Sequence, residues 1–222
     1  MRARLFLTLL SLLVVFGCGG GSKGNTGQVR FVAVSPNAPA LNLVVDGKTL
    51  FSNLAYSNSS DYLALAAGSR HIRAVPVNGT APILNSTVAV GSSTYQTMLL
   101  TGPASQVQPV LLSDGGTTAT SGNGSVRLVN ASETMGAADV YLVPAGTSLA
   151  SVQPVAAGLG FDKNTGYQSV AVGSYEAFLT APGTKNVFLA TGPINLMASQ
   201  NQTVVALDGI SGGFIFTALI DQ

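Results

Sequence analysis

The chain has 222 residues, of which 46% are apolar and only 9% are charged, and its formal net charge is +1. A nucleic-acid-binding surface needs lysine and arginine gathered on one face, and the chain has no long charge run. One histidine and one cysteine are too few for an ordinary zinc site. We therefore expect no nucleic-acid partner, no transition metal and no cofactor. The low charge beside many serine, threonine, asparagine and glycine residues suits an exported β protein.

The N-terminus has the pattern of an export signal. Arg2 and Arg4 precede an apolar run over 5–16, which is followed by glycine and Cys18. The run is shorter than the roughly 20 residues that a membrane-spanning helix needs. A charged start, an apolar run and small residues after it predict a signal peptide over 1–17. The letters VFGC that end at the only cysteine resemble the bacterial lipobox, and this resemblance implies that Cys18 receives a diacylglycerol.

A lipid on Cys18 would tether the chain to a membrane, because each buried CH₂ contributes about 0.8 kcal/mol. Residues 18–27 are rich in glycine, serine and asparagine and predict a flexible spacer. Gly19, rather than an aspartate, follows the cysteine. We therefore expect a lipid-anchored protein of the bacterial cell envelope, at the outer membrane and facing the periplasm or the cell surface.

The chain contains an internal repeat. The stretch over 29–47, VRFVAVSPNAPALNLVVDG, returns over 126–146 as VRLVNASETMGAADVYLVPAG. Strand-like segments recur while the loops between them change length, which indicates a duplicated domain. We place the first repeat at 28–114, a glycine-rich linker at 115–124 and the second repeat at 125–222.

Each repeat reads as a series of short strands separated by turn signals. Seven or eight such strands in each repeat predict an all-β protein with two tandem immunoglobulin-like antiparallel β-sandwich domains. In the first repeat we expect strands at 29–34, 41–46, 48–52, 60–66, 69–77, 83–90, 94–101 and 107–113. In the second repeat we expect strands at 126–131, 138–144, 152–157, 166–172, 174–180, 186–191, 202–208 and 213–220.

Two features interrupt the first strands of repeat one. Two prolines in the segment 35–39 remove backbone donors and disfavour helical geometry in the residues before them, so we expect a kinked corner there. Asp46 and Gly47 then predict a two-residue type I′ hairpin turn, which needs positive φ at both central positions.

These elements resemble a bacterial family of domains of unknown function, DUF4397. The resemblance rests on the S-P-x-A-P corner, on the strand and turn that follow it, and on the DYLALAAG block over 61–68. It implies tandem domains in secreted or lipid-anchored bacterial proteins and implies no reaction. Repeat two carries ETMG over 133–136 in place of the proline corner. If the corner were a shared binding loop, only the first copy would use it fully.

The sequence offers little catalytic chemistry. His71 is the only histidine, and no G-x-S-x-G motif accompanies it, so a serine–histidine arrangement is disfavoured. The segment 162–166 begins like a calcium loop but lacks the downstream glutamate, and an Asx-capped polar turn is the simpler interpretation. Carboxylates are present in number, and a pair of them in one cleft would revive a glycosidase hypothesis. We expect no enzymatic activity.

The resulting hypothesis is a non-catalytic, lipid-anchored envelope protein that acts as a binding or structural module. The membrane is one partner, through the lipid on Cys18, and the second is an unidentified protein or glycan. A carbohydrate-binding module that uses tyrosines is the alternative, and a hydrolase is third. The candidate interface residues are Ser35, Pro36, Asn37, Pro39, Asp46, Tyr62 and Tyr167.

Overall fold

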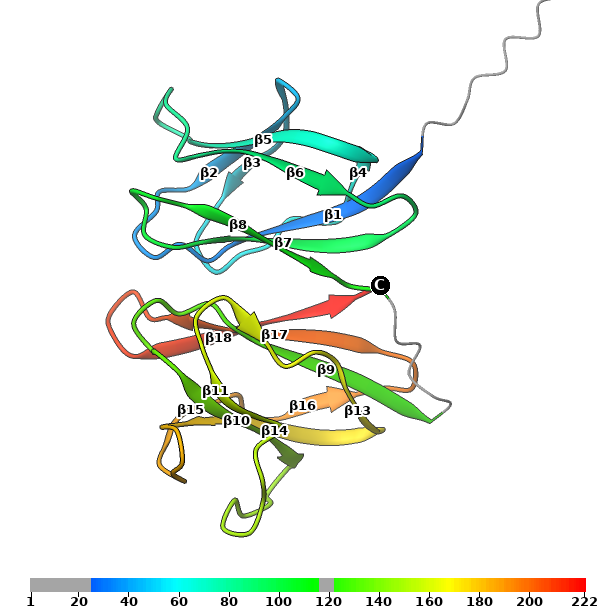
Figure 1. Ribbon diagram of the computed structural model, residues 1–222, viewed down its shortest axis with the longest axis vertical. Coiled ribbons are helices and arrows are strands. Elements are labelled where there is room, and N and C mark those ends of the chain that lie inside the picture. The colour runs from blue at the N-terminus through cyan, green and yellow to red at the C-terminus, as the bar shows by residue number, and fades with distance from the viewer. Residues whose placement is uncertain (1–24, 116–121) are drawn as a thin grey trace, which may run out of the picture.

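A computed structural model describes residues 25–115 and 122–222 as two β-sandwiches stacked on one another (Figure 1). The predicted signal peptide, Cys18, the spacer up to residue 24 and linker residues 116–121 lie outside the described residues. No helix with the length and apolar character of a membrane span occurs in the part of the chain that is described.

The first sandwich consists of eight strands in two sheets. One sheet has the order β4-β1-β7-β8 and the other β3-β2-β5-β6. The strands are β1 (Thr26–Ala33), β2 (Leu41–Val45), β3 (Lys48–Leu54), β4 (Leu63–Ala66), β5 (Gly68–Pro76), β6 (Leu84–Val90), β7 (Tyr95–Thr101) and β8 (Gln108–Ser113).

The second sandwich repeats this plan with two additional short strands. One sheet has the order β12-β9-β17-β18, with β13 also on β9, and the other has β11-β10-β14-β15, with β16 also on β14. The strands are β9 (Asn123–Asn130), β10 (Ala138–Pro144), β11 (Ala156–Leu159), β12 (Lys163–Asn164), β13 (Gln168–Ala171), β14 (Gly173–Thr180), β15 (Val187–Ala190), β16 (Ile194–Leu196), β17 (Asn201–Asp208) and β18 (Phe214–Asp221).

The predicted all-β sandwich class is confirmed, with one difference in strand direction. β1 runs parallel to β7, and β9 runs parallel to β17. The other strand pairs that these sheets contain are antiparallel. Each repeat therefore carries one parallel pair in the sheet that faces the other repeat.

The strand prediction was wrong at three places in repeat two. Most of the segment 152–157 is not a strand, and β11 begins only at Ala156. Its apolar residues belong to a long connection after β10 rather than to an alternating ladder. The short strands β12 and β16 were not predicted, because two or three residues are too few to show a period.

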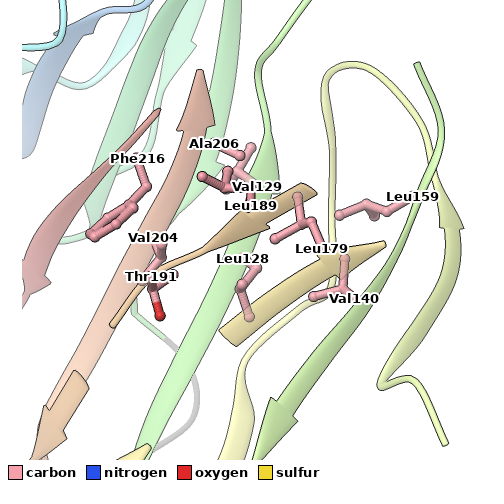
Figure 2. A pocket seen from close by; sticks show the side chains of 10 residues that line it. All are labelled: Leu128, Val129, Val140, Leu159, Leu179, Leu189, Thr191, Val204, Ala206 and Phe216. Carbon is pink, nitrogen blue, oxygen red and sulfur yellow. The ribbon is translucent and has the colours of Figure 1, made fainter. Parts of the chain in front are cut away.

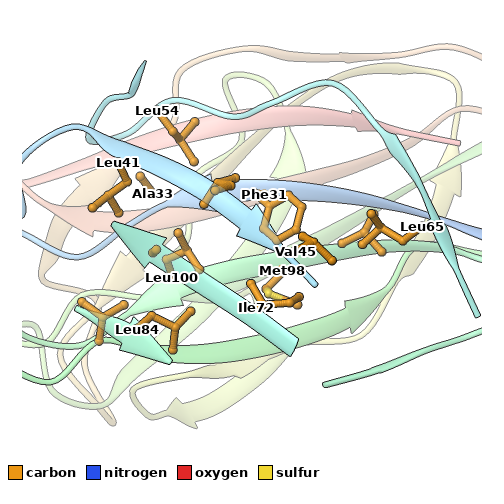
Figure 3. Close-up of a cluster of buried hydrophobic side chains, with 14 of the residues drawn as sticks. Phe31, Ala33, Leu41, Val45, Leu54, Leu65, Ile72, Leu84, Met98 and Leu100 are labelled. Carbon is orange, nitrogen blue, oxygen red and sulfur yellow. The ribbon is translucent and has the colours of Figure 1, made fainter. Parts of the chain in front are cut away.

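Each sandwich has its own apolar core between its two sheets. In the first, Phe31, Leu41, Ile72 and Met98 are fully buried (Figure 3). The second core encloses a cavity of only about 10 Å³ lined almost entirely by apolar side chains (Figure 2). A volume near the minimum for one water means that this core is filled and is not a ligand site.

A third apolar cluster joins the two sandwiches. It packs the outward face of the sheet that contains β1 and β7 against the outward face of the sheet that contains β9 and β17. Its buried members are Val32, Val34, Leu99, Leu112, Val129, Ala131, Val205, Leu207 and Leu219.

The hairpin between β2 and β3 has the predicted backbone geometry. Val45 pairs with Lys48, which leaves two residues in the turn. Asp46 has φ of 48° and Gly47 has φ of 84°, so both central positions are left-handed, as a type I′ turn requires.

Candidate functional site

Buried charges cross the contact between the two sandwiches, which we call the junction. Arg30 on β1 donates to the Asp221 carboxylate on β18 at 2.5 Å and to the Ile220 carbonyl at 2.9 Å. It also donates to the Thr97 hydroxyl of its own sandwich at 2.7 Å. The side chain of Arg30 is 6% exposed and that of Asp221 is fully buried. A buried charge needs a partner and further hydrogen bonds, and Arg30 has both.

A matching contact has the arginine on the second repeat and the aspartate on the first. Arg127 on β9 donates to the Asp114 carboxylate at 2.7 Å and to the Ser113 carbonyl at 2.8 Å. It donates to the Thr203 hydroxyl of its own sandwich at 2.7 Å. Each sandwich therefore supplies one arginine and one aspartate to the junction, and each pair crosses between the repeats.

A tyrosine from each repeat completes this cluster. Tyr62 lies beneath the guanidinium of Arg30, 4.7 Å from ring centroid to Cζ, and donates to Asp114 at 2.8 Å. Tyr167 lies beneath Arg127 at 4.6 Å and donates to Asp221 at 2.8 Å. Burial, and then the neighbouring aspartate, raise the pKa of Tyr62 well above its ordinary value, and burial does the same to the pKa of Tyr167. Both hydroxyls therefore stay protonated as donors.

The arginines also each contact one backbone carbonyl near the end of an edge strand. Within the described residues, β8 and β18 each end their sheet and pair on one side only. The contacts to the Ser113 and Ile220 carbonyls place one guanidinium from the opposite repeat at each edge.

A cleft opens at one end of the junction, where both corners meet the turn between β17 and β18. It encloses about 290 Å³. We call it the corner cleft, and its lining residues are Pro36, Asn37, Glu133, Thr134, Asp208, Gly209, Ile210, Gly212 and Gly213. Both repeats contribute to its wall. The ETMG segment of repeat two supplies Glu133 and Thr134 to the same cleft that the proline corner lines, so both corners form its wall.

Asp208 shapes the second corner. Its carboxylate accepts from the Ser132 hydroxyl at 2.6 Å, from the Glu133 amide at 2.9 Å and from the Thr134 hydroxyl. Tyr56 of the first sandwich donates to the Asp208 carbonyl at 2.6 Å, and burial raises the pKa of Tyr56 to about 12. One residue therefore holds the second corner and ties this end of the junction to repeat one.

A similar tie runs through Asp162. Thr101 at the end of β7 donates to this carboxylate at 3.0 Å, while the other carboxylate oxygen is buried without a hydrogen-bond partner. Burial raises the pKa of Asp162, although the Thr101 hydrogen bond and the charge of Lys163 oppose the rise. In the structure the segment 162–166 bridges the repeats at its first residue, and Asn164 accepts from the Gly166 amide at 2.9 Å.

A second, shallower opening of about 380 Å³ lies toward the C-terminal end of β18. We call it the Tyr62 groove. It is lined by Arg30, Ser59, Ser60, Asp61, Tyr62, Ala218, Leu219, Ile220 and Gln222. Its polar groups include an exposed carboxylate at Asp61, whereas the Arg30 donors are already engaged in the junction.

The structure separates the predicted interface residues into four places. Pro36 and Asn37 line the corner cleft, and Asn37 is exposed with φ of 61°. Ser35 is buried, and Pro39 is exposed at the corner without lining the cleft.

Asp46 lies apart from the corner cleft, in the exposed hairpin, where it pairs with Arg70 at 3.0 Å. Tyr62 and Tyr167 lie in the junction, where an arginine covers one face of each ring. The corner and the tyrosines are therefore two distinct parts of one inter-repeat contact.

Sequence reasoning missed the residues that hold these sites together. The reciprocal pairs Arg30–Asp221 and Arg127–Asp114 were not singled out, nor was Asp208. A signal was available, because arginine and aspartate recur at matching places of the two repeats. A charge that recurs within an otherwise apolar strand marks a buried contact.

Two further features of residues 25–115 and 122–222 concern metal ligands and the single histidine. No three of the His, Cys, Asp and Glu side chains described there come together as metal ligands. The His71 side chain is exposed on the outer face of β5, with Nε2 2.6 Å from the Asn85 amide oxygen.

Comparison with known proteins gives a family and a few distant structures. Residues 27–141, more than half of the chain, match the model described as domain of unknown function (DUF4397). None of the curated proteins compared matches the chain.

Three solved structures are similar at low identity. The product complex of the pneumococcal glycogen-degrading virulence factor SpuA is 9% identical with a TM-score of 0.29, over 83% of this chain and 21% of that one. A streptococcal virulence factor that binds alpha-glucan is 11% identical with a TM-score of 0.27, over 81% and 92%. The CBM26 module CBMbc of Eubacterium rectale Amy13K, with maltoheptaose, is 9% identical with a TM-score of 0.26, over 89% and 97%. The present chain thus spans about a fifth of the SpuA chain. By its family match, the chain belongs to the DUF4397 family.

Proposed function

We propose that the protein is a lipid-anchored, non-catalytic binding module of the bacterial cell envelope, whose partner docks at the corner cleft. The observation that carries this proposal is that both repeats build one cleft of about 290 Å³ at the edge of their junction. Ligand sites occur preferentially where two domains meet. Loops held on a rigid scaffold are also the usual carriers of binding residues.

The position of the corner cleft suits a tethered protein. β1 begins at Thr26, on the side of the predicted spacer, and its far end leads to the corner (Figure 1). A strand of eight residues spans about 26 Å at a rise of roughly 3.3 Å per residue. With a lipid on Cys18, the Thr26 end would lie nearer the membrane and the cleft would face away from it.

The junction supports binding by keeping the cleft walls in place. The cleft draws Asn37 from one sandwich and Glu133 from the other, so a change in their relative position would change its shape. The two buried arginine–aspartate pairs oppose such a movement. A preorganised site loses less conformational entropy when its partner binds.

The lining favours a polypeptide partner over a glycan. Ile210 is 79% exposed and lies beside the polar side chains of Asn37 and Glu133. An exposed apolar side chain next to hydrogen-bonding groups suits a protein loop. No aromatic ring is among the residues that line the cleft, so sugar stacking of the kind expected from tyrosines has no platform there.

The carboxylates of the corner cleft do not support a hydrolase. Glu133 and Asp208 share the cleft, but both Asp208 oxygens accept hydrogen bonds from the second corner. These hydrogen bonds engage the Asp208 oxygens, which glycoside hydrolysis would require to face the sugar. We assign Asp208 a role in holding the corner.

The test is capture of partners by the full lipidated chain from envelope extracts, with variants at the cleft. Ile210→Ser and Asn37→Ala should each reduce the captured partner at least tenfold, while the matched control Val172→Ser, another exposed aliphatic position (50%), should not. Equal capture by all variants would contradict a role of the corner cleft. Binding of the wild-type chain to a glycan array, lost in the same variants, would show that the partner is a glycan.

A further inference from the structure

The junction has an internal symmetry that goes beyond repeated sequence. Each hydrogen bond of the arginine, threonine, tyrosine and aspartate cluster has a counterpart with the repeats exchanged, whereas the Tyr56–Asp208 and Thr101–Asp162 contacts have none. Arg30 Nε to Thr97 measures 3.2 Å and Arg127 Nε to Thr203 measures 3.1 Å. Thr97 donates to Asp114 at 2.5 Å, and Thr203 donates to Asp221 at 2.6 Å. The two sandwiches are thus related, at their contact, as the subunits of a two-fold dimer are.

Each repeat by itself contains both halves of the contact. Arg30 and Asp114 both belong to the first sandwich and lie 3.8 Å apart, although each makes its shorter charged hydrogen bond to the second. Arg127 and Asp221 both belong to the second. A face that presents a donor and its matching acceptor is complementary to a copy of itself, which is the property of an isologous interface.

The apolar part of the junction follows the same rule. Equivalent strand positions carry Val32 and Val129, and likewise Leu112 and Leu219, all of them buried in the shared cluster. Exchange of one face for the other would therefore keep apolar groups opposite apolar groups. One polar contact does not follow the rule: Thr101 donates to Asp162 across the junction, and the strand register puts Leu207 in the place of Thr101 in repeat two.

We propose that the junction face of each repeat recognises a second copy of itself, so that the chain is a covalently linked form of a two-fold dimer. The partner that fits this face is the same face of another molecule. Within one chain the two repeats satisfy each other. When that contact is broken, repeat one of one molecule binds repeat one of the next, and repeat two binds repeat two.

Exchanging the charges of repeat two tests whether each junction face recognises its own copy rather than only the other repeat. In the full chain, Arg127→Asp together with Asp221→Arg places like charges opposite each other in the internal junction, at Arg30 and at Asp114. Repeat one remains complementary to its own copy, and so does the altered repeat two. Sedimentation velocity should show the wild-type chain at monomer mass and this double variant at twice that mass at micromolar concentration.

Two further variants identify the contact. Adding Arg30→Ala to the double variant should weaken the dimer at least tenfold, because both pairs of the contact between first repeats are lost. Exchange of an exposed pair, Arg70→Asp with Asp46→Arg, should leave the mass of the wild type unchanged. A double variant that keeps monomer mass, or a dimer that Arg30→Ala does not weaken, would overturn the proposal.

A second measurement avoids charge substitutions in the core. A protease site placed at 116–121 of the full chain allows the folded protein to be cut between the repeats, and native mass spectrometry after dilution and reconcentration then reports every pairing. The proposal predicts homodimers of each half beside the mixed pair. Recovery of the mixed pair alone would overturn it.

Discussion

Arg30 and Asp221 are 191 positions apart in the chain, yet their side chains meet at 2.5 Å in a buried contact between the repeats. Asp221 also accepts from Tyr167 and Thr203 of its own sandwich. The last strand of the chain is thus held to the first strand by a charged hydrogen bond. This relationship makes the two repeats one structural unit.

Loss of Arg30 should therefore destabilise the whole molecule. Removing one partner of a buried ion pair leaves an uncompensated charge and costs about 3–5 kcal/mol. We expect Arg30→Met to lower the free energy of unfolding by that amount in a urea titration. Arg70→Met, which breaks the exposed pair with Asp46, should cost less than about 1 kcal/mol. Similar losses in the two variants would contradict a special role for the buried pair.

High pH should weaken the fold through Tyr62 and Tyr167. Burial raises the pKa of both hydroxyls in the folded state, whereas a tyrosine in the unfolded chain has a pKa of about 10. Above that value the unfolded state loses protons that the folded state keeps, so stability falls as pH rises.

The measurement is the melting temperature between pH 9 and pH 11 for the wild type and for Tyr62→Phe. The variant should lose about 1–3 kcal/mol at pH 8, because Asp114 loses a buried donor, and should show a smaller decrease with rising pH. An equal pH slope in both proteins would show that Tyr62 is not the group that titrates.

Asp162 should make stability depend on pH in the acidic range. Burial raises the pKa of Asp162 in the folded state, whereas an aspartate in the unfolded chain has a pKa of about 4. At a pH between these two pKa values the folded chain therefore holds a proton that the unfolded chain has lost. The contribution of this group to stability is greatest below the unfolded pKa and falls as pH rises through the folded pKa. Asp162→Asn keeps an acceptor for Thr101 and should flatten the unfolding free energy between pH 4 and pH 7. An unchanged profile would assign the dependence to another group.

The hairpin turn at Gly47 gives a prediction that does not depend on the junction. Its φ is 84°, and a side chain there would meet no atom within 4 Å, so backbone strain alone decides the effect. A left-handed conformation costs a non-glycine residue about 1–2 kcal/mol, and β-branching adds to this. Gly47→Val should lower the melting temperature, whereas Lys48→Val at the neighbouring exposed position should not. Equal stability of the two variants would argue against the left-handed turn.

The sequence predicted the first repeat better than the second. All eight strands expected before residue 114 are present, because turn residues such as Asp46 and Gly47 bound them clearly. In repeat two, a long connection precedes β11, and apolar residues within it imitate a strand. Local pattern does not distinguish an apolar loop segment from a short ladder.

The junction and the corner cleft were less accessible to sequence reasoning. Tyr62 and Tyr167 were selected as interface residues, and the structure places them at the contact between repeats. Their partners Asp114 and Asp221 lie 52 and 54 positions further along the chain, a separation that no local period encodes. The corner cleft likewise depends on Asp208, whose contacts with the second corner span more than seventy positions of the chain.

The corner cleft is the central functional claim, and photo-crosslinking tests it most directly. A photoreactive amino acid is placed at position 210 of the full lipidated chain in bacterial membranes, and the same group at position 172 serves as the control. We predict one crosslinked protein from position 210 that is absent from position 172 and is reduced when Asn37→Ala is added. A crosslink of equal yield from both positions, or none from position 210, would contradict the proposal that a partner docks at the cleft.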